Sequence, residues 1–338
     1  MPSIVWAQTL ETPSPIDRHP SAGWDPGPSD TKSNVTASNA GDSSLRWNDG
    51  VNKIPKYPVI FVVGLGDPGN AAWRDFAERL WPGLTAKHLE GTLWAQVKND
   101  SGPPEVVLKK IEEVVQALQQ RYFDAYRPAG VAQASDVKLI LYGRSYGAVL
   151  VRDYLSDHLN NHHVAGVLME AGPHQGAEVT RLAVIPQALT WGGAGAALAT
   201  GQVALGLYAV VGLAIPWIAD NVMGLNLEAG GLYALRPGSP YLQDLSKRVL
   251  PTDIRYINVV ENCAESQAIL LNLFELNVTA ADGGISVHSQ TLSPSVVPNF
   301  DQLKLKQVSG SVFHWTIPEE SLETVGPLLY ELEGETSK

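Results

Sequence analysis

One pentapeptide in the sequence has the residue types of a nucleophilic serine at the spacing that such a serine needs. Residues 143–147 are Gly-Arg-Ser-Tyr-Gly, which is the pattern G-x-S-x-G. The two glycines leave room where a strand and a helix crowd together around a strained serine. A helix that begins directly after Ser145 would point backbone N–H groups and a partial positive charge at an oxyanion forming beside it. Ser145 is therefore the predicted nucleophile, and the alternative is a serine that merely caps the helix.

The segments on either side of the pentapeptide have the periodicity that this chemistry requires. Residues 137–142 (Val-Lys-Leu-Ile-Leu-Tyr) are rich in branched and apolar side chains, as in a buried strand. Residues 148–155 have the spacing of a helix. Strand, tight turn and helix in this order are the context in which G-x-S-x-G carries a nucleophile.

A serine hydroxyl is a weak nucleophile and needs a histidine as general base. On a strand, turn and helix of this kind, the chain order is serine, acid, histidine, so the base must follow an acid that itself follows Ser145. Six of the eight histidines come too early for this order: His19, His88, His158, His162, His163 and His174. Of the two that remain, His288 lies in an alternating segment, whereas His314 lies in a loop that contains glycine and serine and precedes the last helix. His314 is the predicted base.

The acid that orients the histidine should lie between the penultimate strand and His314. Asp282 begins the turn Asp-Gly-Gly and satisfies this order, although Asp-Gly is also a common ordinary turn. Glu261, directly at the end of the strand expected over 253–260, is the alternative. We predict Asp282 as the acid and keep Glu261 as its rival.

A glycine-rich loop follows the first apolar strand, expected over 57–63. Residues 64–69 are Gly-Leu-Gly-Asp-Pro-Gly, and Pro68 breaks the pattern of a phosphate-binding loop. The other function of such a loop is to point a backbone N–H group at a reacting carbonyl. Leu65 is the predicted donor of that N–H group.

Apolar strands alternate with helical segments along the chain, which predicts a mostly parallel sheet covered by helices on both faces, an α/β fold. The expected strands are 57–63, 93–97, 137–142, 164–170, 253–260 and 303–308, and the expected long helices are 71–80, 104–127 and 318–332.

Two further segments define the expected domain organisation. Residues 1–55 are rich in Pro, Ser, Asp, Asn and Gly and predict an extended arm. Residues 182–219 contain no charged side chain, and we interpret them as an apolar cap over the site rather than as a buried core insertion or a membrane span. The expected core is then residues 56–180 and 251–338, with a cap or lid over 181–250.

The composition excludes some classes of function. The formal net charge is −11, with no basic cluster, which argues against a nucleic-acid partner. Cys263 is the single cysteine, so the sequence contains neither an internal disulfide nor a cysteine-based metal site. The N-terminal residues 1–8 make a poor signal peptide, and the compartment stays open.

Several motifs in this order resemble the α/β-hydrolases of the lipase type, over about residues 57–332. They are Val63–Gly66, Gly143–Gly147, Gly172–Gly176, Leu235–Ser239 and Asp282–Gly284. The resemblance implies a triad of Ser145, Asp282 and His314, and an oxyanion hole formed by the N–H groups of Leu65 and Tyr146. Many of these enzymes have His-Gly where this chain has Val63–Gly64. The loops 64–67 and 173–176 also resemble those of palmitoyl-thioesterases.

These observations predict a serine hydrolase that cleaves carboxylic esters of apolar or acyl-chain substrates through an acyl-enzyme, without a metal or an organic cofactor. The uncharged segment 182–219 suits an acyl chain and would also allow contact with a lipid surface. A thioesterase or acyltransferase with the same triad is the first alternative. A non-catalytic protein of this fold that binds lipid or a partner is the second.

Overall fold

The structure is a computed structural model that describes part of the chain. The described residues are 54–65, 70–82, 89–98, 102–178, 180, 230–263, 282, 284–312, 314 and 318–334. The expected arm over 1–55 lies outside them except for its last two residues. The uncharged segment 182–219 lies outside them entirely, as do the central glycine of Asp-Gly-Gly and residues 66–69 of the first loop.

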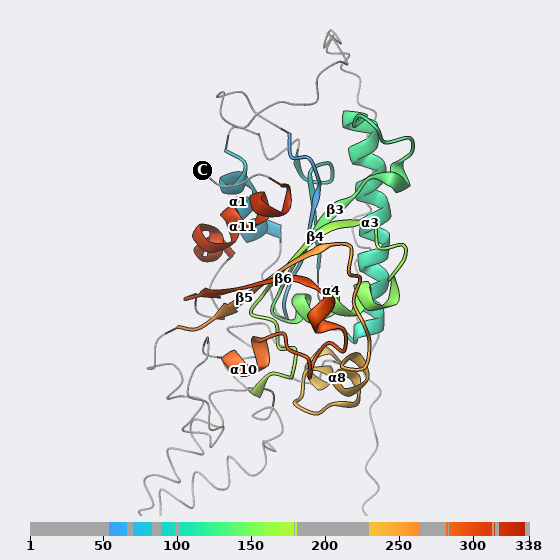
Figure 1. The fold of residues 1–338 in the computed structure, drawn as a ribbon. Coiled ribbons are helices and arrows are strands. Elements are labelled where there is room, and N and C mark those ends of the chain that lie inside the picture. Colours follow the sequence, from blue (N-terminus) through green and yellow to red (C-terminus); the bar gives the residue numbers. More distant parts are fainter. Residues whose placement is uncertain are drawn as a thin grey trace, which may run out of the picture. The chain divides into compact units, whose positions relative to one another are not determined.

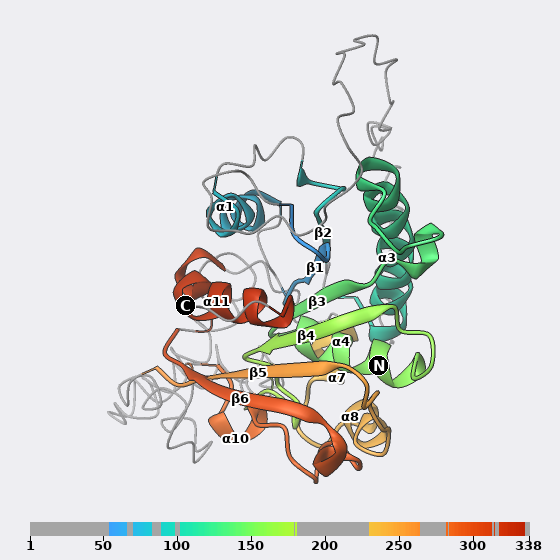
Figure 2. The same cartoon turned by 45° about the horizontal axis from the view of Figure 1, so that its top comes forward.

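A six-stranded sheet forms the centre of the described chain, with the strand order β2-β1-β3-β4-β5-β6 (Figures 1 and 2). Every neighbouring pair in it is parallel. The strands are β1 (Val59–Val62), β2 (Trp94–Val97), β3 (Leu139–Arg144), β4 (Val164–Glu170), β5 (Arg255–Glu261) and β6 (Lys304–Gly310). The parallel sheet predicted from the alternation of strands and helices is confirmed.

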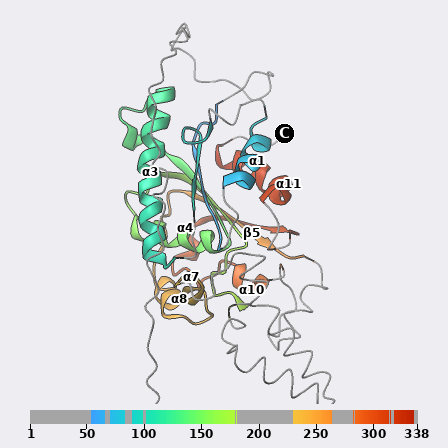
Figure 3. The same cartoon turned by 180° about the vertical axis from the view of Figure 1, so that it is seen from behind.

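Two pairs of helices cover the two faces of this sheet (Figure 3). The helices α3 (Pro104–Tyr126) and α4 (Tyr146–Asp157) pack on one face with a shared apolar cluster. The helices α1 (Asn70–Leu80) and α11 (Leu322–Leu332) pack on the other. Because both faces are covered, β1 and β3 are buried along their whole length, which explains the continuous apolar runs Val59–Val62 and Leu139–Tyr142.

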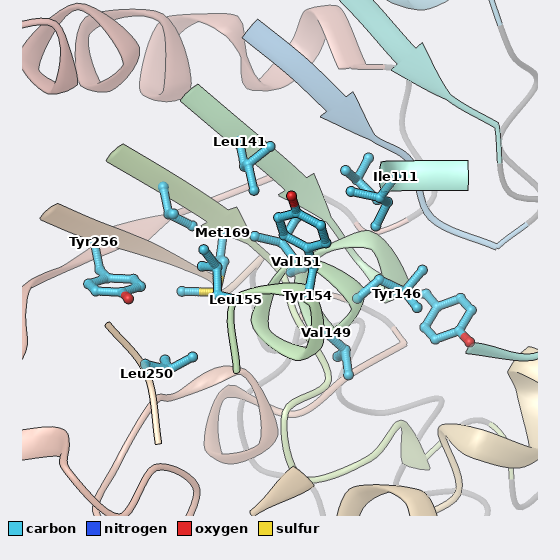
Figure 4. Packing of buried hydrophobic residues seen from close by; sticks show 14 of the residues in the cluster. Ile111, Leu141, Tyr146, Val149, Val151, Tyr154, Leu155, Met169, Leu250 and Tyr256 are labelled. Atoms are coloured by element: carbon cyan, nitrogen blue, oxygen red, sulfur yellow. The ribbon is translucent and has the colours of Figure 1, made fainter. Parts of the chain in front are cut away.

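An apolar cluster joins α4, the helix that begins directly after Ser145, to the sheet (Figure 4). Val151 and Leu155 of α4 join Leu141 of β3 and Met169 of β4 in it, and all four are fully buried. Ile111, on the apolar face of α3, belongs to the same cluster. Helix α4 and the turn before it are therefore fixed on the sheet by close packing.

Shorter helices lie in the connections. They are α7 (Gly230–Ala234), α8 (Pro240–Leu245) and α10 (Val287–Gln290), with the 3-10 turns η1 (Ala134–Asp136), η3 (Phe300–Gln302) and η4 (Pro318–Ser321). The long helix expected over 318–332 thus begins as a 3-10 turn, and the α-helix proper begins at Leu322. Of the helices that the structure describes, none is long and apolar enough to cross a membrane.

Candidate active site

Ser145 occupies the sharp turn between β3 and α4. Its backbone has φ 56° and ψ −126°, a conformation that costs energy for a residue with a side chain. Its N–H group donates to the carbonyl of Glu170, at the end of the neighbouring strand β4, at 2.9 Å. The strain is thus held in place by the sheet on one side and by the packed helix on the other.

The two glycines of the pentapeptide stand where the backbone leaves no room for a side chain. A Cβ atom on Gly147 would come 1.8 Å from the carbonyl oxygen of Val62. A Cβ atom on Gly143 would come 2.6 Å from the carbonyl oxygen of Gly147. The close approach of β1, β3 and α4 is therefore the reason for glycine at both positions.

The Ser145 side chain points to His314 rather than back onto its own helix. Its Oγ lies 2.8 Å from His314 Nε2. Ser145 is the N-cap residue of α4, yet within the described chain its hydroxyl makes no capping bond to that helix. The geometry thus disfavours the alternative in which this serine only caps the helix.

Asp282 holds the other side of the His314 ring. His314 Nδ1 lies 2.6 Å from Asp282 Oδ2, and the His314 backbone N–H donates to the Asp282 carbonyl at 2.8 Å. The second carboxylate oxygen, Oδ1, accepts from the N–H groups of Gly284 at 3.0 Å and Ile285 at 2.8 Å. Because a carboxylate only accepts, the ring proton belongs on Nδ1, and Nε2 is left to accept the Ser145 O–H.

Glu261, the rival candidate for the acid, has a different partner. Its Oε2 accepts from the backbone N–H of Val312 at 2.7 Å, in the loop that carries His314. Burial, together with the negative charge of Glu170, raises the pKa of Glu261 to about 7. Of the two candidate acids, Asp282 is the one whose carboxylate contacts the His314 ring. Glu261 instead holds the backbone of the loop that carries His314.

The residues predicted for the oxyanion hole lie next to Ser145. Tyr146 is the first residue of α4, and Leu65 lies three residues after Val62, the last residue of β1. A Cβ atom on Gly64 would come 2.8 Å from Ser145 Cβ, so this loop touches the serine directly. A Cβ on Gly231 of α7 would meet both the Tyr146 ring at 2.8 Å and the Leu65 side chain at 3.1 Å. The side chains of the two predicted donor residues therefore both lie against Gly231 of α7.

Several residues around the site could not be identified from the sequence, because their partners are distant in the chain. Arg144 donates to the His314 carbonyl at 3.4 Å and pairs with the buried Glu170 at 3.5 Å. Glu178 accepts from the Ser286 N–H at 3.1 Å, close behind Asp282. No motif in the sequence marks these residues as neighbours of the site, apart from the position of Arg144 directly before Ser145.

The turn Pro173–Gly176 holds α10, the short helix that follows the Asp282 turn in the chain. Gln175 Nε2 donates to the His288 carbonyl at 2.9 Å, and Ser289 Oγ donates to the Gly176 carbonyl. His174 is buried, and this burial lowers its pKa to about 3, so its ring is neutral. His174 therefore belongs to the packing beneath the site.

Within the described ranges, no cluster of three or more acidic, His or Cys side chains is arranged to hold a metal ion.

Solved structures with similar folds include a lipase and a carboxyl esterase. The mature form of the lipase BlEst2 from Bacillus licheniformis has a TM-score of 0.50 and 17% identity, over 82% of this chain and 92% of its own. Its propeptide form has a TM-score of 0.49 and 17% identity, over 84% of this chain and 52% of its own. The metagenomic carboxyl esterase MGS0156 has a TM-score of 0.47 and 15% identity, over 88% of this chain and 81% of its own.

Neither a protein-family model nor a curated protein sequence matches the chain. At 17% identity, the likeness to mature BlEst2 is informative about the fold alone. It agrees with the all-parallel sheet and with helices on both of its faces. The chain therefore has the α/β-hydrolase fold.

Proposed function

We propose that this protein is a serine hydrolase that cleaves carboxylic esters of apolar or acyl-chain substrates through an acyl-enzyme. The observation that carries the proposal is the hydrogen-bonded series from Ser145 Oγ through His314 to Asp282, at 2.8 and 2.6 Å. A nucleophile, a base and an orienting acid at these distances are the parts that acyl transfer needs.

The first half of the reaction forms the acyl-enzyme. His314 Nε2 takes the proton of the Ser145 hydroxyl while Oγ attacks the ester carbonyl carbon. The carbonyl oxygen becomes an oxyanion, which the N–H groups of Leu65 and Tyr146 bind, each contributing about 3 kcal/mol to lowering the barrier. Asp282 stabilises the positive imidazolium. The tetrahedral intermediate then expels the alcohol, and His314 gives its proton to the leaving oxygen.

The second half of the reaction releases the acid. A water molecule gives a proton to His314 and attacks the acyl carbon, and the ester bond to Ser145 Oγ breaks as His314 returns the proton to the serine. Every atom and proton is supplied by the ester, by water and by these three residues, so the proposed cycle contains no cofactor.

The substrate class is inferred from the sequence of residues 182–219, which lie outside the described residues. A segment of this length without a charged side chain is suited to contact with an acyl chain or with a lipid surface. The mature BlEst2 structure, which shares the fold, is that of a lipase. We therefore propose apolar esters as the substrates and this segment as the part of the chain that selects them.

Hydrolysis of p-nitrophenyl esters of increasing acyl length tests the proposal, with Ser145→Ala as the control. We expect wild-type turnover to favour the longer esters and the alanine variant to lose about 10⁶-fold in kcat, as removal of such a nucleophile does elsewhere. A fluorophosphonate probe should label the wild type and leave Ser145→Ala unlabelled.

Three outcomes would redirect the assignment. Hydrolysis of short esters alone would keep the triad and contradict the acyl-chain substrate. No hydrolysis combined with labelling of Ser145 would indicate a thioester substrate or an acceptor other than water, and no labelling at all would contradict a catalytic function.

A further inference from the structure

Gln290, the last residue of α10, makes three hydrogen bonds with its side-chain amide although it is fully buried. Its Oε1 accepts from the N–H of Glu261 at 2.7 Å, and its Nε2 donates to the carbonyl of the same residue at 3.0 Å. The amide thereby pairs with both backbone groups of the last residue of β5, as a neighbouring strand would. Its Nε2 also donates to the carbonyl of Ile285 at 3.0 Å.

Ile285 is the link between this amide and the proposed acid. The Ile285 N–H donates to Asp282 Oδ1 at 2.8 Å, and the Asp282 N–H donates to the Ile285 carbonyl at 3.3 Å. That carbonyl is the one to which Gln290 donates. The Gln290 amide therefore ties the turn that presents the Asp282 carboxylate to the end of β5, while Glu178 holds the following residue, Ser286.

The other end of this connection is rigid. The Gln290 carbonyl accepts from Asn258 Nδ2 at 3.0 Å, so the main chain of Gln290 is also attached to β5. Strand β5 lies between β4 and β6 in the sheet, and Asn258 and Glu261 are both buried. A movement of the Asp282 turn relative to the sheet must break bonds that have no water to replace them.

We propose that Gln290 is a positioning residue that keeps the Asp282 carboxylate within hydrogen-bond distance of His314 by tying the Asp282 turn to the end of β5. The catalytic meaning of this inference depends on the proposed function. Without the bond to Ile285, the turn shifts, the His314 ring loses its fixed tautomer and orientation, and the imidazolium formed during catalysis is less stable.

The test compares Gln290→Met with Gln119→Met in the full chain. Gln119 lies on α3 and is also buried. Its Nε2 also donates to two backbone carbonyls, those of Ser135 at 3.4 Å and Val137 at 2.7 Å. Neither partner belongs to the Asp282 turn. Both variants replace an amide by an apolar chain of similar length, so both should lower the melting temperature. Gln119→Met controls for that general loss.

We expect only Gln290→Met to change the chemistry. Its kcat should fall by about 10²-fold, as for a misplacement of about 1 Å, with KM nearly unchanged. The acidic limb of its kcat/KM profile should move to lower pH, because the loosened carboxylate supports a protonated His314 less well. Equal kcat and equal acidic limbs in the two variants would overturn the inference.

A measurement without substrate separates this inference from the proposed function. The proton between His314 Nδ1 and Asp282 should give a far-downfield ¹H NMR signal that is absent from His314→Ala, and Gln290→Met should weaken or shift it while Gln119→Met leaves it in place. This holds even if the wild type hydrolyses no ester, an outcome that would contradict only the proposed function. If Gln290→Met does not fold, Gln290→Leu likewise removes both donated bonds with a smaller apolar side chain. An unchanged signal in that variant overturns the inference.

Discussion

Asp282 and His314 are joined twice, although 32 residues separate them in the sequence. The side chains meet at 2.6 Å between Oδ2 and Nδ1, and the His314 N–H donates to the Asp282 carbonyl at 2.8 Å. The backbone hydrogen bond holds the two residues close together. The Asp282 carboxylate and the His314 ring are therefore already within reach of each other. The proposed triad, whose members come from separate loops, is thus arranged in advance of any ligand, as preorganised catalysis requires.

Replacing Asp282 should therefore cost far more activity than replacing its rival. Asp282→Asn presents an amide to His314 Nδ1 and favours the wrong tautomer of the ring, for which the loss in kcat is about 10⁴-fold. Glu261→Gln keeps an oxygen that can accept from Val312 N–H, and we expect a loss below about tenfold. The rates of p-nitrophenyl ester hydrolysis by the two variants decide between the acids, and the opposite ranking would make Glu261 the acid.

Gly64→Ala should impair the site without unfolding the protein. The new Cβ would lie 2.8 Å from Ser145 Cβ and 3.2 Å from its Oγ, so the serine or the loop must move. A displacement of this kind lowers kcat by about 10²-fold, and crowding lowers the free energy of unfolding by about 1–3 kcal/mol.

Gly102→Ala is the matched control for that variant, because the nearest atoms to its Cβ lie 4.0 Å away at ordinary contact distance. Ester hydrolysis and urea denaturation of both variants measure the two effects. Wild-type kcat in Gly64→Ala would contradict the close contact between this loop and Ser145.

The sequence predicts the chemistry-bearing residues better than their supports, for a physical reason. Ser145 is marked by a local pattern of glycines, and His314 and Asp282 by their order in a chain of alternating strands and helices. Gln290 has no such mark. Its three partners are backbone groups in two other segments, and a buried glutamine has no periodicity or motif that would reveal them.

The same distinction holds for the fold. The strands and long helices follow from apolar periodicity, which is a property of neighbouring residues. The beginning of the last helix does not, because residues 318–321 form a 3-10 turn in which Ser321 Oγ donates to the Pro318 carbonyl at 2.8 Å. Periodicity cannot separate such a turn from the first turn of an α-helix.

Helix α3 offers a test of the packing beneath the site. Ile111→Ala removes a fully buried side chain from the cluster shared with α4, and we expect a loss of about 2–5 kcal/mol in the free energy of unfolding. Val106→Ala on the same helix removes a side chain that is 47% exposed, and should change it by less than about 0.5 kcal/mol. Urea denaturation measures both, and equal losses would mean that α3 does not pack as described.

The pKa of Glu261, about 7 in the folded protein against an ordinary value of 4.5, has a consequence for stability. Between these two values the folded state binds more protons at this carboxyl than the unfolded state does. The contribution of Glu261 to the free energy of unfolding is therefore fully present below pH 4.5 and is lost as the pH rises through about 7. The cause is the cost of a buried negative charge near Glu170.

Glu261→Gln cannot ionise and should lose this dependence. We expect the melting temperature of the wild type, relative to that of the variant, to be higher at pH 5 than at pH 8. The comparison of the two proteins cancels the titration of the groups that they share. Glu105→Gln, at an exposed glutamate of α3, is the matched control for exchanging a carboxyl for an amide. A constant difference between pH 5 and pH 8 would mean that Glu261 is ionised in the folded protein throughout this range. Its bond to Val312 N–H would then be that of a carboxylate at every pH at which ester hydrolysis is measured.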